Sequence, residues 1–402
     1  MRILQIIKTG DGAKWAVDQV RELCGLGIEV HVAIPTLDGR LADDWRRSGA
    51  TLHAADLDLP VRQPWRLVQR MRRVRDLVDR IAPDLIHSHF FGPTLVMRYA
   101  LGADHPVPRL FQVPGPLHLE HRLYRSWELS TAGPRDFWVP SSRYIRGLYR
   151  RAGVSPDRLF LSYYGNERTE VEASRSTIRE ELGIGTDALV VGNINYMYPP
   201  KYYLGQTKGL KRHEDVIDAL GLALEQRSDL YGVLIGGQWG AGNAYEQRLR
   251  RRAQRAAGGR ILMPGRLEYG RAGDAWAGFD LAIHVPTSEN CGGVVEPLLA
   301  AVPVVASRTG GLPELVIDQV TGRLVEDGEP RRLAGVIEEV LDDLPRYREM
   351  ASTGRRLVKE MFDVRRTAAE IAAVYRHLTD DSPYVPPEFD SKAFVNGTRG
   401  HG

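Results

Sequence analysis

At 402 residues the chain is too long for one ordinary hydrophobic core, so its length predicts about two domains. Hydrophobic residues make up 43% of the sequence and charged residues 26%, which is ordinary for a soluble globular protein. A net charge of +3 is too small to indicate a nucleic-acid partner.

The two cysteines, Cys24 and Cys291, provide neither a disulfide framework nor a metal-ligand spacing. The apolar run at 3–7 is shorter than the h-region of a signal peptide, and no run approaches the roughly 18 apolar residues of a membrane span. We therefore expect a cytoplasmic protein. Arginine-rich runs at 70–75 and 248–252 have the spacing of solvated helix faces, and the alternative is weak attraction to acidic substrate or to anionic lipid at the inner face of the membrane.

The first half of the chain alternates predicted strands and helices. A strand at 1–8, a turn with Gly10 and Gly12, a helix at 15–26 and a strand at 27–35 predict the opening of a parallel doubly wound sheet. Further strands are predicted at 49–53, 84–89 and 109–113, a helix at 65–81, and apolar runs at 137–140 and 159–164 close this half. The turn lacks the G-x-G-x-x-G dinucleotide fingerprint, although its backbone could approach a phosphate.

Three histidines lie at predicted strand ends, where parallel sheets bind ligands. His87 and His89 end the strand at 84–89, and His118 follows the strand at 109–113. The H-x-H spacing puts two side chains on one face and would suit zinc, but no third ligand is forced. Hydrogen bonding within the core suits His87 and His89 at least as well, whereas we expect His118 to bond a hydroxylated ligand.

Residues 167–188 are polar and predict a linker with an outer helix, after which the alternation restarts. Strands are predicted at 189–194, 231–235, 260–263, 281–285 and 304–306, and helices at 214–227, 245–257, 296–301, 312–318, 330–344, 346–361 and 364–378. The tail after Asp380 is predicted to pack loosely. Two doubly wound domains joined by a linker imply a cleft that both sets of strand ends face.

The stretch from Ser288 to Ala300 places two glycines and two carboxylates in a loop that opens a helix. Gly292 and Gly293 allow a ligand to approach the backbone, and a helix start offers unpaired N–H groups. Glu289 and Glu296 are suitable acceptors for sugar hydroxyls. Acids in a first helical turn also favour the helix start electrostatically, so both interpretations stay open here.

A long loop at 195–209 and the residues after it are rich in tyrosine and in cations, namely Tyr196, Tyr198, Tyr202, Tyr203, Lys201, Lys208, Lys211 and Arg212. Cations at a helix start oppose the helix dipole, so they favour a bound anion such as a diphosphate; a flexible basic loop is the alternative. Gly-rich turns at 236–237 and 310–311 lie at the same predicted sheet edge. Several such turns beside a lysine loop indicate a sugar-nucleotide site.

The segment from Asp280 to Val325 resembles the sugar-nucleotide-binding region of the retaining GT-B glycosyltransferases of family 4. The matching pieces are Glu296, seven residues before Pro303, then 310–314 and 321–325. Residues 211–214 resemble the family's Lys-Gly-His loop, 10–14 its N-terminal glycine loop, and 114–118 the place of a histidine near the sugar. Phe362 and the following helix resemble the family's last helix, which crosses back to the first domain.

The resemblance implies an α/β GT-B fold with two Rossmann-like doubly wound domains facing a central cleft. An N-terminal acceptor-side domain would span 1–165, and a C-terminal nucleotide-sugar-binding domain would span 188–361. The helix at about 362–378 would cross back onto the first domain, and 380–402 would form a loosely packed tail.

The resemblance also implies a retaining, metal-independent glycosyltransferase without a cofactor. The donor would be a UDP or GDP sugar, and the acceptor a small molecule or a glycan. The implied catalytic residues are His118, Glu289 and Lys211. The implied donor-binding residues are Gly12, Lys211, Asn290, Cys291, Gly292, Gly293, Glu296 and Gly311, and the acceptor-facing residues are His89, His121 and Trp15.

Some positions depart from the family pattern. Six residues separate Glu289 from Glu296, where the family has seven, and Arg212 replaces the usual glycine after the phosphate lysine. The family's phosphate arginine has no clear match, since Asn193 or Asn195 stands near its place; Lys201 or Lys208 could substitute. A sugar-nucleotide 2-epimerase and a non-catalytic sugar-nucleotide-binding protein are the alternatives, and the sequence does not predict the oligomeric state.

Overall fold

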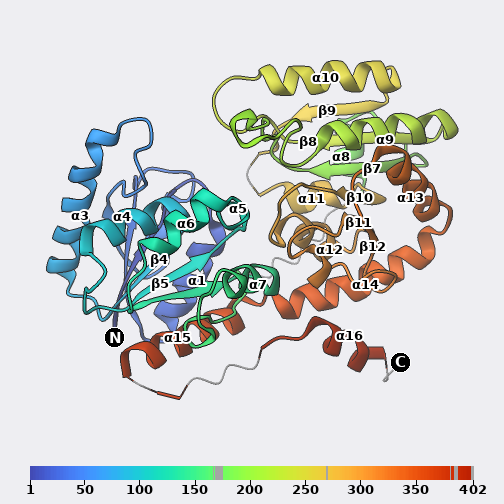
Figure 1. Cartoon of the computed structure of the whole chain (residues 1–402). Coiled ribbons are helices and arrows are strands. Elements are labelled where there is room, and N and C mark those ends of the chain that lie inside the picture. The colour runs from blue at the N-terminus through green and yellow to red at the C-terminus, as the bar shows by residue number, and fades with distance from the viewer. Residues whose placement is uncertain (166, 168–174, 269, 381, 384–387, 400–402) are drawn as a thin grey trace. The chain divides into compact units, whose positions relative to one another are not determined.

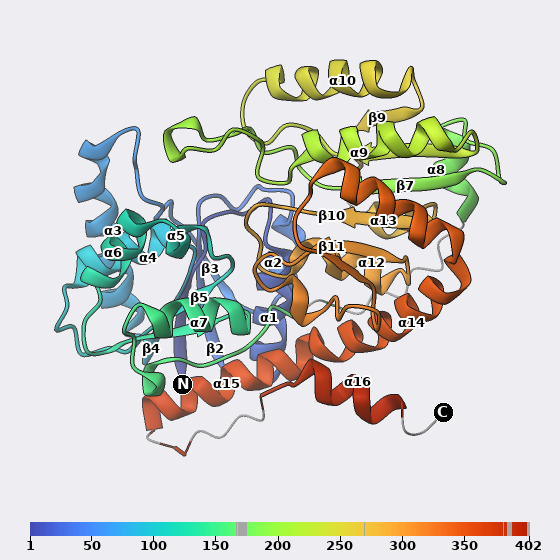
Figure 2. The ribbon, with the colours of Figure 1, turned by 45° about the vertical axis from the view of Figure 1, so that its right-hand side comes forward.

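The computed structural model describes residues 1–165, 167, 175–268, 270–380, 382–383 and 388–399. The chain forms two compact units, Met1–Arg168 with Met361–Phe389 and Thr169–Glu360 with Asp390–Gly402. Each unit contains a six-stranded sheet in which every neighbouring pair is parallel, with helices packed against it (Figures 1 and 2). The predicted α/β class with two doubly wound sheets is confirmed.

The first unit has the strand order β3-β2-β1-β4-β5-β6. Its elements are β1 (Arg2–Ile6), α1 (Lys14–Gly25), β2 (Glu29–Ile34), α2 (Ala42–Arg47), β3 (Thr51–Ala54), η1 (Pro64–Arg66), α3 (Leu67–Ile81), β4 (Leu85–His89), α4 (Phe91–Leu101), β5 (Arg109–Val113), α5 (Leu117–Glu120), α6 (Arg122–Ser130), β6 (Asp136–Pro140), α7 (Arg143–Arg151), η2 (Pro156–Arg158) and α15 (Val364–Asp380). The apolar run at 159–164 lies beside β6 through one bridge, Trp138 to Leu159, and forms no strand of its own.

Helices cover both faces of the first sheet because successive strand side chains point to opposite faces. Ile3 packs in one core cluster with residues of α1 and of α15, including Tyr375. Leu4, the next residue, packs in a second cluster with residues of α3 and α4. The late helix α15 therefore completes the core of the unit that begins at Met1.

The second unit has the strand order β12-β11-β10-β7-β8-β9, which is the same order when its strands are counted from β7. Its elements are α8 (Arg175–Glu181), β7 (Leu189–Ile194), η3 (Tyr202–Leu204), α9 (His213–Gln226), β8 (Leu230–Ile235), α10 (Ala244–Ala257), β9 (Ile261–Gly265), α11 (Ala272–Trp276), β10 (Leu281–His284), η4 (Gly292–Val294), α12 (Val295–Leu299), β11 (Val304–Ser307), η5 (Leu312–Glu314), β12 (Arg323–Val325), α13 (Pro330–Asp342), α14 (Leu344–Met361) and α16 (Ser391–Arg399). Its largest core cluster joins one face of the sheet to α9, α10 and α13.

The helix predicted at 312–318 is wrong, because the structure has only the short 3-10 turn η5 there. Thr321 interrupts the helix: its Oγ1 accepts a hydrogen bond from the Ile317 N–H at 2.7 Å and donates to the Leu315 carbonyl at 2.6 Å. A continuing helix would need both backbone groups for its own hydrogen bonds.

Several helices were not predicted, among them α2, α4, α6, α7 and α16. The last of these lies in the tail after Asp380, where Val395 is 1% exposed. In the part of the chain that the structure describes, no helix is both long enough and apolar enough to cross a membrane.

Candidate functional site

At the carboxyl edge of the second sheet, three side chains from separate segments meet. Lys211 precedes α9, His284 ends β10, and Glu289 lies in the loop before η4. The Glu289 carboxylate forms an ion pair with Lys211 Nζ and lies 2.9 Å from His284 Nε2. It also accepts the Asn290 N–H at 3.1 Å. Lys211 and Glu289 were predicted from the sequence. His284, which belongs to strand β10 and bonds Glu289, was not.

The charge of Glu289 is set by its two neighbours. Burial by itself would raise the pKa of this carboxyl, but the Lys211 ammonium and the His284 hydrogen bond hold it well below its usual range. Burial lowers the pKa of His284, so its ring is neutral at pH 7. Because a carboxylate only accepts, Nε2 of His284 carries the proton and Nδ1 can accept from Asn195 Nδ2 at 3.4 Å.

The glycines around Glu289 are needed for different reasons. A Cβ at Gly293 would lie 2.0 Å from His284 Nε2, so this position must lack a side chain for the imidazole to reach Glu289. Gly310 has a φ of +60°, and a Cβ there would lie 1.7 Å from the Glu289 carbonyl oxygen. Gly292 is exposed, and a Cβ there would meet no atom within 4 Å. Gly292 is thus the position with room for a ligand.

Cys291, which belongs to this loop, packs against Gly311. The Cys291 thiol is buried, 3.7 Å from the Gly311 carbonyl, and burial raises its pKa well above the ordinary value. A buried protonated thiol is a packing group, so only the backbone of Cys291 is placed to meet a ligand.

Glu296, in α12, differs from Glu289 in having no ion-pair partner among the described residues. The residue is exposed, yet the protein that surrounds the carboxyl raises its pKa. Trp276 lowers the pKa in part, and the carboxylate keeps further acceptor positions for hydroxyl groups.

The cations before α9 are balanced by an acid that the sequence analysis missed. Lys208 Nζ and Arg212 Nε each lie 2.5 Å from a carboxylate oxygen of Asp215, in the first turn of α9. Asp215 thus supplies the negative charge that was predicted from the sequence to come from a bound anion. Asp215 lies only a few residues after three cations in the sequence, and this proximity could have indicated the pairing. Of these cations, Lys211 alone bonds Glu289.

Tyr196 and Tyr198 of the loop at 195–209 form part of an aromatic cluster, whereas Tyr202 and Tyr203 are exposed. The ring centroid of Trp239 lies 5.0 Å from that of Tyr196 and 5.6 Å from that of Tyr198. The Arg266 guanidinium lies 5.6 Å from the Tyr196 ring centroid. Trp239 follows β8 and Arg266 follows β9. These two contacts of the tyrosines come from distant segments and were not predicted from the sequence.

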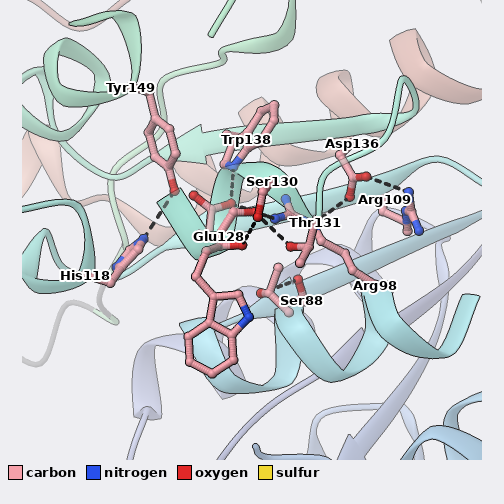
Figure 3. Close-up of polar contacts among 12 residues, drawn as sticks. Ser88, Arg98, Arg109, His118, Glu128, Ser130, Thr131, Asp136, Trp138 and Tyr149 are labelled. Atoms are coloured by element: carbon pink, nitrogen blue, oxygen red, sulfur yellow. Dashed lines mark hydrogen bonds and ion pairs between the residues drawn. The ribbon is translucent and has the colours of Figure 1, made fainter. Parts of the chain in front are cut away.

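In the first unit, His118 lies in α5, just after β5. Its Nε2 lies 3.4 Å from the Tyr149 hydroxyl (Figure 3). The centroid of its ring lies 5.4 Å from that of Phe91. Burial lowers the pKa of His118 to about 4. His118 is therefore a neutral, part-exposed imidazole at pH 7.

His89, expected to face an acceptor, lies fully buried instead. Its Nδ1 is 3.1 Å from the Tyr164 hydroxyl and its Nε2 is 3.2 Å from Gln5 Oε1. His87 bonds the Tyr375 hydroxyl at 2.6 Å. Core hydrogen bonding thus accounts for both histidines. No group of three His, Cys, Asp or Glu side chains that could hold a metal ion occurs among the residues that the structure describes.

The other predicted residues of this unit are part-exposed. The rings of Trp15 and Tyr164 are tilted by 48° with centroids 3.9 Å apart, and the His121 ring centroid lies 4.9 Å from that of Tyr124. Gly12 lies in the turn before α1, where a Cβ would meet only the methyl of Thr9. Trp15 and Gly12 thus lie just after β1, and His121 lies between α5 and α6.

Family models match both halves of the chain. The model described as Glycosyltransferase Family 4 matches residues 12–165, and the one described as Glycosyl transferases group 1 matches residues 176–357. A D-inositol 3-phosphate glycosyltransferase of Catenulispora acidiphila is 30% identical over 315 residues, which are 75% of this chain and 67% of that relative. The chain belongs to the family 4 glycosyltransferases. The resemblance inferred from the sequence is therefore confirmed.

Other relatives of this glycosyltransferase are matched over less of their length. A D-inositol 3-phosphate glycosyltransferase of Xylanimonas cellulosilytica is 27% identical over 212 residues, and the chain spans 47% of it. Among solved structures, HepE of Anabaena in complex with UDP-glucose has a TM-score of 0.77 and 20% identity, covering 93% of this chain and 99% of that one. This likeness supports the GT-B fold.

Proposed function

We propose that this glycosyltransferase moves a sugar from a UDP or GDP sugar to a hydroxyl group of its acceptor, with retention of configuration and without a metal ion. The observation that carries the proposal is the Lys211–Glu289–His284 cluster beside the open position at Gly292. Ligands of open parallel sheets bind at this edge. A related fold holds UDP-glucose in the Anabaena structure, which supports a nucleotide-sugar donor.

The cluster gives each group a task in this reaction. When the bond between sugar and diphosphate breaks, negative charge develops on the leaving phosphate, and the Lys211 ammonium would stabilise it by exchanging its carboxylate partner for the phosphate. Glu289, still held by His284, would accept hydrogen bonds from donor-sugar hydroxyls. The leaving phosphate oxygen would take the proton of the acceptor hydroxyl, so no protein nucleophile is required.

The remaining assignments extend this proposal. Backbone N–H groups of Gly12, Gly311 and residues 290–293 would bind the donor, Glu296 would bind its ribose hydroxyls, and His118 would contact the donor sugar. The acceptor would meet Trp15 and His121. Since His89 is buried with both ring nitrogens bonded, it would act only through its neighbours.

A thermal-shift screen with UDP-, GDP-, ADP- and TDP-sugars tests the proposal. A donor at 100 times its Kd stabilises the protein by about 2.7 kcal/mol, so one sugar nucleotide should raise the Tm clearly. No shift with any donor would overturn it. With the donor identified, NMR of the product should show the donor's anomeric configuration, and EDTA should leave the rate unchanged. Release of a 2-epimerised sugar without acceptor would identify an epimerase instead.

Glu296→Ala tests the ribose assignment. Losing a charged acceptor should weaken donor binding by about 10- to 100-fold, measured by calorimetric titration. Glu326→Ala is the matched control, since it removes a surface carboxylate of the same unit that pairs with Arg308. Equal affinities in the two variants would contradict the assignment.

A further inference from the structure

One carboxylate oxygen of Glu289 is shared by two partners. The Lys211 ammonium forms an ion pair with Oε2, and Nε2 of His284 lies 2.9 Å from the same oxygen. The other oxygen, Oε1, accepts the Asn290 N–H at 3.1 Å. All three side chains of this cluster are largely buried. An ionised carboxylate in such a place needs a cation beside it, because a buried charge without a partner is strongly destabilising.

Lys211 is that cation, and His284 is uncharged. Because the carboxylate only accepts, Nε2 of His284 carries the proton of the ring, and Nδ1 faces Asn195 Nδ2 at 3.4 Å. Burial lowers the pKa of His284; the hydrogen bond to Glu289 opposes this, and the Lys211 charge lowers the pKa further. His213, in α9, also interacts electrostatically with His284, but its buried ring has a pKa of about 3 and is neutral at pH 7.

Binding of the donor changes this balance of charge. In the proposed reaction Lys211 exchanges Glu289 for the diphosphate, so the carboxylate loses its cation while the diphosphate brings further negative charge. Both changes favour the protonated form of His284, since loss of a nearby cation and approach of an anion each raise the pKa of an imidazole. Asn195 suits both forms, because its amide can donate to a bare Nδ1 or turn its oxygen to accept from Nδ1–H.

We propose that His284 is a positioning residue that binds a proton at Nδ1 when the donor takes Lys211, so that the imidazolium replaces the ammonium as the cation beside Glu289. This inference rests on the proposed function, in which Lys211 moves to the diphosphate. The proton comes from solvent, and it returns there when the nucleoside diphosphate leaves and Lys211 pairs with Glu289 again. Glu289 thus stays ionised and in place to accept a hydrogen bond from a hydroxyl of the donor sugar.

Nitrogen NMR of histidine-labelled protein tests the exchange of cations without any donor. Lys211→Met removes the ammonium, and the spectrum of His284→Gln assigns the His284 signals. At pH 7 we expect a neutral ring with Nε2–H in the wild type and a doubly protonated ring in Lys211→Met, with a proton affinity at least about tenfold higher. Lys208→Met is the matched control, since Lys208 pairs with Asp215, and it should leave the ring neutral. A neutral His284 in Lys211→Met would overturn the proposal.

Calorimetric titration measures the proton in the unmodified protein. UDP-glucose and GDP-glucose have no phosphate group that titrates near neutral pH, so proton uptake on binding reports the protein. In buffers with different heats of ionisation at pH 7, we expect uptake of about half to one proton per donor bound to the wild type. His284→Gln should bind the donor without uptake, because its amide can still donate to Glu289 but cannot be protonated.

The outcomes of the titration separate this inference from the proposed function. Binding to the wild type without proton uptake, or equal uptake by His284→Gln, would overturn the role of His284 and leave the transferase proposal intact. Failure of both donors to bind would contradict the proposed function, while the NMR comparison separately decides whether His284 takes the charge.

Discussion

The two sheets have the same strand order, and each has an enclosed carboxylate paired with arginine at its amino edge, Asp136 in the first unit and Asp280 in the second. In the first unit, Arg109 begins β5 and Asp136 begins β6, and their side chains meet at the amino edge with 0% and 1% exposure. In the second unit, Lys211 and Glu289 meet at the carboxyl edge, next to an open glycine. Charges of the first kind are enclosed by protein, whereas those of the second kind are 13% and 11% exposed at the edge where parallel sheets bind ligands.

The carboxyl edge of the first sheet carries one part-exposed ion pair, Lys8 with Asp58. The fully enclosed polar side chains near this edge are neutral. Gln5, His87, His89 and Gln112 lie there, fully buried. Their partners are one another and the hydroxyls of Tyr164 and Tyr375. The two ion pairs thus differ in burial: one is enclosed within its unit, and the other is part-exposed where we propose that the donor binds.

The largest expected effect is on the stability of the first unit. Asp136→Asn removes the charge that Arg98 and Arg109 share and should lower the free energy of unfolding by about 3–5 kcal/mol. Glu29→Gln, which removes a solvent-exposed pair with Arg2, should lower the free energy of unfolding far less, because water and salt screen the pair. Urea unfolding followed by fluorescence measures both. Comparable small losses would show that enclosure adds nothing to the pair at the amino edge.

Lys211→Ala should have the opposite balance of effects, with a large loss of turnover and a smaller loss of stability. Without the ammonium, turnover should fall about 100- to 1000-fold, because the leaving phosphate loses its cation. Stability should fall less than in Asp136→Asn, since His284 can take a proton and remain paired with Glu289. Initial rates and urea midpoints should be compared with Lys208→Ala, whose partner Asp215 keeps Arg212. A rate unaffected by Lys211→Ala would remove the distinction between the two edges.

Gly293→Ala and Gly292→Ala separate packing from open space within one loop. The added methyl at Gly293 meets His284 Nε2, whereas at Gly292 it meets nothing within 4 Å. We expect Gly293→Ala to lower the free energy of unfolding by about 1–3 kcal/mol. Gly292→Ala should leave stability close to that of the wild type and weaken donor binding instead. Urea unfolding and donor titration measure the two effects, and identical stabilities would contradict the inferred contact.

The smallest expected effect at neutral pH comes from His213, beside the cluster in the second unit, because its contribution to stability changes only on acidification. It is fully buried, and burial lowers its pKa to about 3, below the roughly 6.5 of the unfolded chain. Between these values only the unfolded state binds the proton, so stability falls on acidification from pH 6.5 toward 3. Replacing it, as in His213→Leu, should reduce the slope of stability against pH by up to about 1.4 kcal/mol per unit. Parallel slopes would refute this.

The alternation of strands and helices was predictable because buried parallel strands are continuous apolar runs bounded by turn residues. Helix α4 was missed for the converse reason: it is buried on nearly every side, so its sequence shows no polar face. Of the site, Lys211, Glu289 and Glu296 could be chosen from spacing and residue type. The charge partners of this region could not, since the fold alone brings His284 to Glu289 and Asp215 to Lys208 and Arg212.

The amino-edge charges of the first unit also escaped prediction. Arg98, Glu128 and Asp136 come from three elements, and nothing in their local sequence marks them as partners. Ion pairs between distant segments depend on tertiary packing, which cannot be predicted from hydrophobic periodicity or from short motifs.

The placement of α15 has a consequence for synthesis on the ribosome. The first unit needs Tyr375, whose hydroxyl bonds His87 and Gln5, yet this helix is made after the whole of 169–360. The second unit can thus fold while the first still waits for its last helix, with apolar surface and a buried histidine uncovered. We expect nascent chains stopped before Val364 to be held by chaperones, although nearly nine-tenths of the sequence would already be present.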